Sequence, residues 1–107
     1  ELSREGDKYP CVKIDDVVTV SKIIPTALSI DTEGSEFEVL RGAEMTLLRY
    51  HPKIWLSLHP EFMFNMFHEY SGDLRYWLKK MAYKETILDY QHEVHLYYEF
   101  DKDLILI

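Results

Sequence analysis

Glycine is scarce in this chain, and its few copies lie far apart. The 107 residues include four glycines, Gly6, Gly34, Gly42 and Gly72. A loop that lets the backbone approach a dinucleotide or a related cofactor needs closely spaced glycines directly after a strand. These residues therefore include no glycine-rich cofactor loop.

Cysteine and long apolar runs are also scarce. The single cysteine, Cys11, excludes a disulfide within the chain and fits a reducing compartment. No apolar run approaches the ~20 residues that a membrane-spanning helix needs, and no signal peptide opens the sequence. These features predict a cytoplasmic location and no membrane span.

Basic residues are outnumbered, with 12 Lys and Arg against 19 Asp and Glu and a formal net charge of -7. Phosphate binding draws on clustered Lys and Arg, so we expect no nucleic-acid partner. An acidic surface also keeps a protein soluble, so the charge by itself identifies no ligand. The hydrophobic share of 47% is ample for a core and predicts one compact unit.

Two short apolar runs predict strands that end side by side. Ala27–Ile30 has the pattern of a strand buried on both faces, and Lys53–Leu58 that of a second strand. Asp31 and Glu33 follow the first strand, and His59 follows the second. Ligands of open parallel α/β sheets bind beside the carboxyl ends of the strands. We therefore predict that these three side chains converge on one edge of the sheet.

The segment between these strands predicts two short helices. Ser35 and Glu38 match a capping box, in which each side chain satisfies a backbone amide at the start of a helix. Gly42 costs about 1 kcal/mol relative to Ala inside a helix. We therefore expect a break there, between helices at residues 36–41 and 43–50.

The flanking segments predict further elements. Residues 12–14 suggest a brief strand, after which Asp15 and Asp16 would cap a helix, with a substrate or metal role as the open alternative. A Phe and Met cluster at residues 62–67 suits a core or oligomer contact, or a lid over a substrate. We then expect a helix from Ser71 and extended segments at residues 85–90, 93–100 and 104–107.

The segment IDTEGSEFEVLRGAEMTLLRYHPKI, residues 30–54, resembles the signature of FkbM-type methyltransferases. In that family an Ile-Asp-x-Glu-Gly-x-Glu run opens a helix that leads to a Gly-Ala pair and then to Pro-Lys-Ile. The upstream CVKIDDVV is similar to the Leu-Asp-Asp segment that precedes this signature. The resemblance covers about residues 9–59.

This resemblance implies the C-terminal half of a class I, Rossmann-like α/β methyltransferase domain. Such a domain is a three-layer sandwich whose mostly parallel sheet ends in an antiparallel pair. The family would place the glycine-rich cofactor loop N-terminal to every motif seen here, so we expect residues 1–107 to form a partial domain that is inactive alone.

The implied activity is S-adenosylmethionine-dependent O-methyl transfer to a sugar or small natural product. The expected partners are a small-molecule or glycan acceptor, and at the exposed edge of the 27–30 strand either the missing N-terminal half or a second copy.

Within this picture, Asp31 or His59 would be the general base, because either can accept the proton of an acceptor hydroxyl. Glu33 would bind the acceptor, or share a divalent cation with Asp31, although no other residue supports a cation. We predict no metal site, since the histidines lack the His-x-x-x-His spacing typical of zinc helices.

Three alternatives stay open. His59 can be a histidine hydrogen-bonded to the backbone at a strand end. The chain can be a non-catalytic interaction module or a degenerate methyltransferase that lacks cofactor binding. A metal-dependent hydrolase has only the carboxylates and histidines in its favour.

Overall fold

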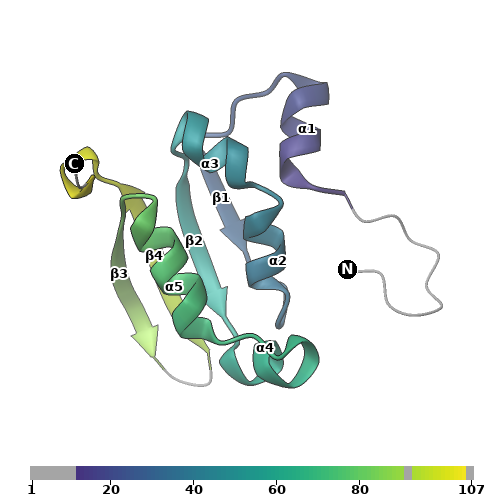
Figure 1. Cartoon of the computed structure of the whole chain (residues 1–107), viewed down its shortest axis with the longest axis vertical. Coiled ribbons are helices and arrows are strands. Elements are labelled where there is room, and N and C mark those ends of the chain that lie inside the picture. Colours follow the sequence, from purple (N-terminus) through teal and green to yellow (C-terminus); the bar gives the residue numbers. More distant parts are fainter. Residues whose placement is uncertain (1–11, 91–92, 106–107) are drawn as a thin grey trace.

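The computed structural model describes residues 12–90 and 93–105, so the expectation for Cys11 lies outside it. Helices separate the first three strands along this part of the chain, and the last two strands follow each other directly (Figure 1). In order, they are α1 (Ile14–Ser21), β1 (Ala27–Ile30), α2 (Glu36–Arg41), α3 (Glu44–Tyr50), β2 (Lys53–Leu58), α4 (Pro60–Phe67), α5 (Ser71–Lys80), β3 (Tyr83–Tyr90), β4 (Val94–Phe100) and a 3-10 turn at Lys102–Leu104. The two predicted strands and the helix break at Gly42 are confirmed.

The strands form one mixed sheet in the order β1-β2-β4-β3. β1 and β2 run parallel, whereas β4 runs antiparallel to both β2 and β3. The antiparallel pair predicted for the end of the chain is thus confirmed. The mostly parallel sheet is not, because one of the three pairings among the described residues is parallel.

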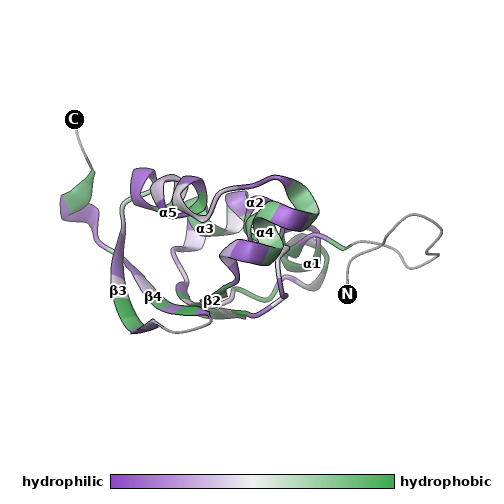
Figure 2. Cartoon of the chain, turned by 90° about the horizontal axis from the view of Figure 1, so that it is seen from below, coloured by the Kyte–Doolittle hydropathy of each residue, from purple (hydrophilic) through white to green (hydrophobic). Residues whose placement is uncertain are grey.

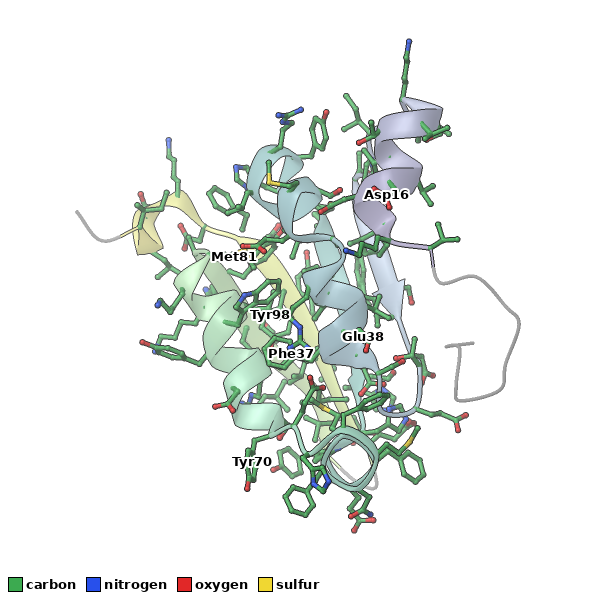
Figure 3. The ribbon with its side chains drawn as sticks, turned by 45° about the vertical axis from the view of Figure 1, so that its right-hand side comes forward. Asp16, Phe37, Glu38, Tyr70, Met81 and Tyr98 are labelled. Atoms are coloured by element: carbon green, nitrogen blue, oxygen red, sulfur yellow. The ribbon has the colours of Figure 1, made fainter. Side chains whose placement is uncertain are left out.

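The helices lie along one face of the sheet (Figure 2). Burial in β2 follows the two-residue period of a strand: Ile54, Leu56 and Leu58 are buried, whereas Lys53 and Trp55 are exposed. Burying one such side chain contributes about 1.5–3 kcal/mol. Residues from the helices and from β4 complete or flank this core, among them Leu40, Leu47, Leu74, Leu78, Tyr98, Phe37 and Met81 (Figure 3).

The opposite face and the β1 edge are more open than predicted. Trp55 is 43% exposed, and its ring packs against Tyr97 on that face. The third layer of the expected sandwich is therefore not confirmed within the described residues. Only Ile30 of β1 is buried, so the prediction of a strand buried on both faces is wrong. The reason is its position at the edge of the sheet, where β2 is its one partner strand in the described part of the chain.

Asp15 makes a tertiary contact that its sequence position conceals. The predicted strand at residues 12–14 is wrong, because α1 begins at Ile14 and Lys13 occupies its N-cap position. Asp15 therefore lies inside α1, and its carboxylate accepts hydrogen bonds from the amides of Met45 (3.0 Å) and Thr46 (2.9 Å) and from the Thr46 hydroxyl (2.7 Å). It satisfies amides at the start of α3, where no intrahelical acceptor exists.

The capping box at Ser35 and Glu38 is also wrong. Ser35 is the N-cap residue of α2 but makes no side-chain cap bond, and it is only 4% exposed. The carboxylate that serves the backbone here is Glu36, which folds back over the preceding loop and accepts hydrogen bonds from the amides of Thr32 and Gly34.

The C-terminal part mostly follows the prediction. α5 begins at Ser71, β3 begins two residues before the expected segment, and β4 matches it closely. Residues 62–67 lie in α4, where Met63 enters the core and Phe62 stays exposed. The extended segment predicted from Leu104 is wrong at its start, because Leu104 ends the 3-10 turn and its amide donates a hydrogen bond to the Asp101 carbonyl. The end of that segment, residues 106–107, lies outside the described part.

A polar cluster joins α5 to the β3–β4 hairpin. The Arg75 guanidinium donates two hydrogen bonds to Glu85, at 2.8 and 2.5 Å, and the Tyr98 hydroxyl donates to the same carboxylate at 2.5 Å. The Arg75 bonds lower the pKa of Glu85, although burial acts in the opposite direction. Burial is the main cause that raises the pKa of Tyr98, and the hydrogen bond to Glu85 is the second. These groups stabilise the packing of α5 on the sheet.

Candidate functional site

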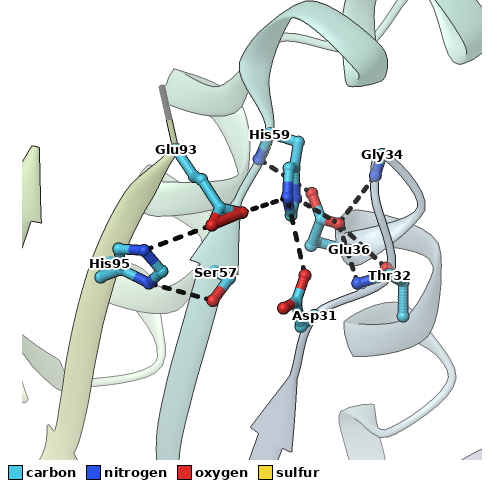
Figure 4. Close-up of polar contacts among 8 residues, drawn as sticks. All are labelled: Asp31, Thr32, Gly34, Glu36, Ser57, His59, Glu93 and His95. Atoms are coloured by element: carbon cyan, nitrogen blue, oxygen red, sulfur yellow. Dashed lines mark hydrogen bonds and ion pairs between the residues drawn. The ribbon is translucent and has the colours of Figure 1, made fainter. Parts of the chain in front are cut away.

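Asp31 and His59 lie together at one edge of the sheet (Figure 4). Asp31 follows β1 and His59 follows β2, and the parallel pairing of these strands brings both ends to the same place. Asp31 Oδ1 is 3.5 Å from His59 Nε2. The side chain of Asp31 is 59% exposed and that of His59 is 10% exposed, so an accessible carboxylate adjoins a nearly buried imidazole.

Glu33, the third predicted site residue, is placed differently. It is exposed and has a left-handed backbone conformation, with φ of 54°. Gly34 continues the turn with φ of 121°, and a Cβ there would lie 2.8 Å from Phe62 Cβ. Within residues 12–90 and 93–105, no hydrogen bond or ion pair joins Glu33 to Asp31 or His59. Its position on the loop leaves its carboxylate available to a ligand.

Glu36 is a member of the site that sequence reasoning missed. Its side chain is 0% exposed, and its carboxylate accepts hydrogen bonds from the Gly34 amide (2.8 Å), the Thr32 amide (3.3 Å) and hydroxyl (3.0 Å), and the His59 amide (3.1 Å). Several donors offset the cost of burying a carboxylate. Glu36 thus ties the acidic loop to the start of α4. A usable signal was the position of Glu36 beside the acidic loop at Gly34, but the capping prediction drew on its neighbours Ser35 and Glu38.

His59 is in contact with three carboxylates. Its Nδ1 is 3.2 Å from Glu36 Oε2, and its Nε2 is 2.5 Å from Glu93 Oε2 and 3.5 Å from Asp31 Oδ1. The ring of Phe62 packs beside the imidazole, with centroids 6.0 Å apart. The imidazole nitrogens therefore face acidic side chains, and not the backbone as the simpler interpretation of a strand-end histidine would have it.

Glu93 is the second member that the sequence did not reveal. It precedes β4, which is inserted beside β2 by antiparallel pairing. Its other oxygen lies 3.4 Å from His95 Nε2, and His95 Nδ1 contacts the Ser57 hydroxyl at 3.1 Å. A polar chain therefore runs from His59 across the end of β4 to Ser57. The contact between His95 and Ser57 depends on the pairing of β4 with β2, which the local sequence pattern does not give.

Asp31, His59 and Glu93 offer ligand atoms that all lie within 4.8 Å of one another, so their geometry is compatible with a cation. His68 and Glu69 lie elsewhere: His68 is the C-cap residue of α4, and Glu69 pairs with Arg41. The prediction that the chain holds no metal stays a prediction.

The arrangement is suited to proton transfer. Among the ion pairs of the described residues, no Lys or Arg reaches Asp31, Glu36 or Glu93. The imidazole is thus the group at this edge that can carry positive charge against them. A histidine that is oriented by a buried carboxylate on one nitrogen is the arrangement used by general bases, and here the second nitrogen faces the partly exposed carboxylates of Asp31 and Glu93.

Comparison with known families decides the class of the protein. The family model described as "Methyltransferase FkbM domain" matches residues 3–85, well over half of the chain. This chain belongs to the FkbM methyltransferase family. No curated protein and no solved structure matches it significantly.

The resemblance seen in the sequence is thus confirmed, and membership of the FkbM family indicates methyl transfer as the class of activity. The matched range contains Asp31, Glu36 and His59, whereas Glu93 lies beyond it. In the part of the chain that the structure describes, no helix is long and apolar enough to cross a membrane.

Proposed function

We propose that this chain is the acceptor-side half of an S-adenosylmethionine-dependent O-methyltransferase that acts on a hydroxyl of a sugar or small natural product. The observation that carries the proposal is the pairing of His59 with buried Glu36, beside the exposed Asp31, at the carboxyl ends of two parallel strands. Edges of this kind bind ligands in open α/β sheets. The family supports methyl transfer, and the site supports proton removal from the acceptor.

In this proposal S-adenosylmethionine, when bound, supplies a methyl group activated by a sulfonium. The residues of this chain would handle the proton: His59 Nε2 or Asp31 would accept it from the acceptor hydroxyl, whose oxygen takes up the methyl group. The positively charged sulfonium fits an edge with three carboxylates. The described residues offer no closely spaced glycines to hold the rest of the cofactor, so Asp31 is the residue here best placed to face it.

Glu93 occupies the position that the acceptor needs. A separation of 2.5 Å between Glu93 Oε2 and His59 Nε2 requires a hydrogen between the two atoms. While that contact exists, Nε2 already has its proton and cannot accept another. We therefore propose that the acceptor hydroxyl displaces Glu93 from Nε2 and that the shared hydrogen leaves with Glu93 as a neutral carboxyl group, so that Nε2 is free to accept the hydroxyl proton. Glu33 at the rim of the loop would bind other hydroxyls of the acceptor.

The experiment that tests this function compares variants of the complete methyltransferase, meaning this chain together with the segment that carries the cofactor loop. Asp31→Asn and His59→Ala should each lower methyl transfer by about a hundredfold or more, the usual range for a positioned general base. Their melting temperatures should stay close to that of the wild type. Glu38→Gln, on an exposed position of α2, is the matched control. Unchanged rates in both site variants would refute the proposal.

A non-catalytic interaction module is the second candidate, and the open β1 edge favours it. Among the described residues β1 pairs with β2 alone, and two of its four residues, Ala27 and Ser29, are exposed. Unpaired strands of this kind pair with other chains. The variant His59→Ala distinguishes the two candidates. An interaction module would keep its partner binding in this variant, whereas the enzyme would lose turnover.

A further inference from the structure

We propose that Glu36 is a positioning residue that fixes the tautomer of His59. It keeps a proton on Nδ1, so that Nε2 is the ring nitrogen that gains and loses a proton. The catalytic meaning of this assignment rests on the proposed function, but its spectroscopic test does not.

The hydrogen bonds of Glu36 leave one choice for Nδ1. Glu36 Oε2 faces the amide N–H groups of Gly34 and Thr32, at 2.8 and 3.3 Å, so it acts as an acceptor and has no room for a hydrogen of its own. The 3.2 Å contact from this oxygen to His59 Nδ1 therefore needs a hydrogen on the nitrogen. Glu36 Oε1 accepts a hydrogen bond from the His59 backbone amide, so one carboxylate holds both the backbone and the imidazole ring of His59.

The other ring nitrogen faces the open side of the edge. Four side chains surround the imidazole: Asp31 after β1, Glu36 in α2, Phe62 in α4 and Glu93 before β4. Of the three carboxylates, only Glu36 is fully buried, whereas Asp31 and Glu93 are 59% and 36% exposed. Exchange of protons with a ligand is therefore confined to Nε2. This is the division of roles that lets a buried carboxylate orient a catalytic histidine.

Nuclear magnetic resonance of the nitrogen-15-labelled 107-residue chain tests the assignment directly. Long-range proton–nitrogen spectra distinguish protonated from bare ring nitrogens, and the His59 signals are identified by their loss in His59→Gln. We expect the spectrum to show a hydrogen on Nδ1, as the contact with Glu36 requires. A bare Nδ1, or a mixture of both tautomers, would overturn the proposal.

Two variants extend the test. Glu36→Gln should produce a mixture of tautomers, because an amide cannot accept from every donor that the carboxylate serves. Glu38→Gln, two residues along α2 and exposed, should leave the His59 spectrum unchanged. A wild-type tautomer in Glu36→Gln would contradict the role of Glu36. If Glu36→Gln does not fold, the wild-type spectrum decides the question alone.

The complete enzyme supplies a second readout. Glu36→Gln should lower kcat by about tenfold or more, as expected when a histidine loses its orienting carboxylate, with a smaller change in the KM for the acceptor. An unchanged kcat together with a confirmed Nδ1 proton would keep the tautomer assignment and refute its catalytic importance. That pattern differs from failure of the proposed function, in which His59→Ala would also be active.

Discussion

The contact of Asp15 with α3 gives the sharpest stability prediction. Asp15→Ala removes hydrogen bonds to two amides and one hydroxyl of Met45 and Thr46. At about 0.5–1.5 kcal/mol for each bond the loss would reach a few kcal/mol. The Met45 amide is exposed and can bond to water instead, so we expect about 2 kcal/mol, at the upper end for loss of a helix cap.

The assay is urea and thermal denaturation of the chain, with Asp16→Ala as control. Asp16 is the neighbouring aspartate of α1, is exposed, and accepts no side-chain hydrogen bond among the described contacts. A loss of 1 kcal/mol lowers Tm by roughly 4–8 °C in a domain of this size, so Asp15→Ala should lower it by about 8 °C or more. Asp16→Ala should change it little. Equal effects of the two substitutions would refute the tertiary cap.

Three further predictions concern the loop, the polar cluster and the sheet edge. Gly34→Ala should destabilise the fold by more than about 1 kcal/mol, because Gly34 has a positive φ and an added Cβ would meet Phe62. Gly72→Ala is the control and should be neutral or stabilising, because a Cβ at Gly72 in α5 has open space. Equal unfolding midpoints of the two variants would contradict this prediction. The lowered pKa of Glu85 means that its carboxylate stabilises the fold above the usual pKa of a glutamate and that this effect is lost as pH falls through the folded-state pKa. The difference in urea midpoint between wild type and Glu85→Gln should therefore shrink on acidification. A difference that stays constant with pH would be inconsistent with the Arg75 contact. One edge of β1 has no partner strand within the described residues, so we expect self-association that sedimentation detects and Ser29→Lys reduces, since Lys on an edge strand disfavours pairing. A strictly monomeric wild type would show that the edge is protected.

Local patterns in the sequence were enough to predict several elements. The apolar runs at β1 and β2 are short and bounded by polar or proline residues, which is why their limits are correct. Gly42 marks the break between α2 and α3 because a helix tolerates glycine poorly. Asp31 and His59 were found for the same kind of reason, since both directly follow strands of a parallel pair.

The parts that were missed depend on contacts between distant segments. Glu93 reaches His59 because β4 pairs antiparallel with β2, and periodicity does not give that pairing. Asp15 was assigned to its own helix because the packing of α1 on α3 was unknown. Glu36 was overlooked because a glutamate at the start of a helix is normally exposed, and only the folded loop shows five donor contacts converging on it.

The identity of the methylated atom tests the central claim most directly. The complete protein should be incubated with S-adenosylmethionine carrying a labelled methyl group and with hydroxyl-bearing acceptors, and the products analysed by mass spectrometry and nuclear magnetic resonance. We predict a methyl ether on a former hydroxyl oxygen, formed about a hundredfold more slowly by His59→Ala. Transfer to nitrogen or carbon, or an equal rate of ether formation in His59→Ala, would contradict the assignment of this edge as the acceptor site.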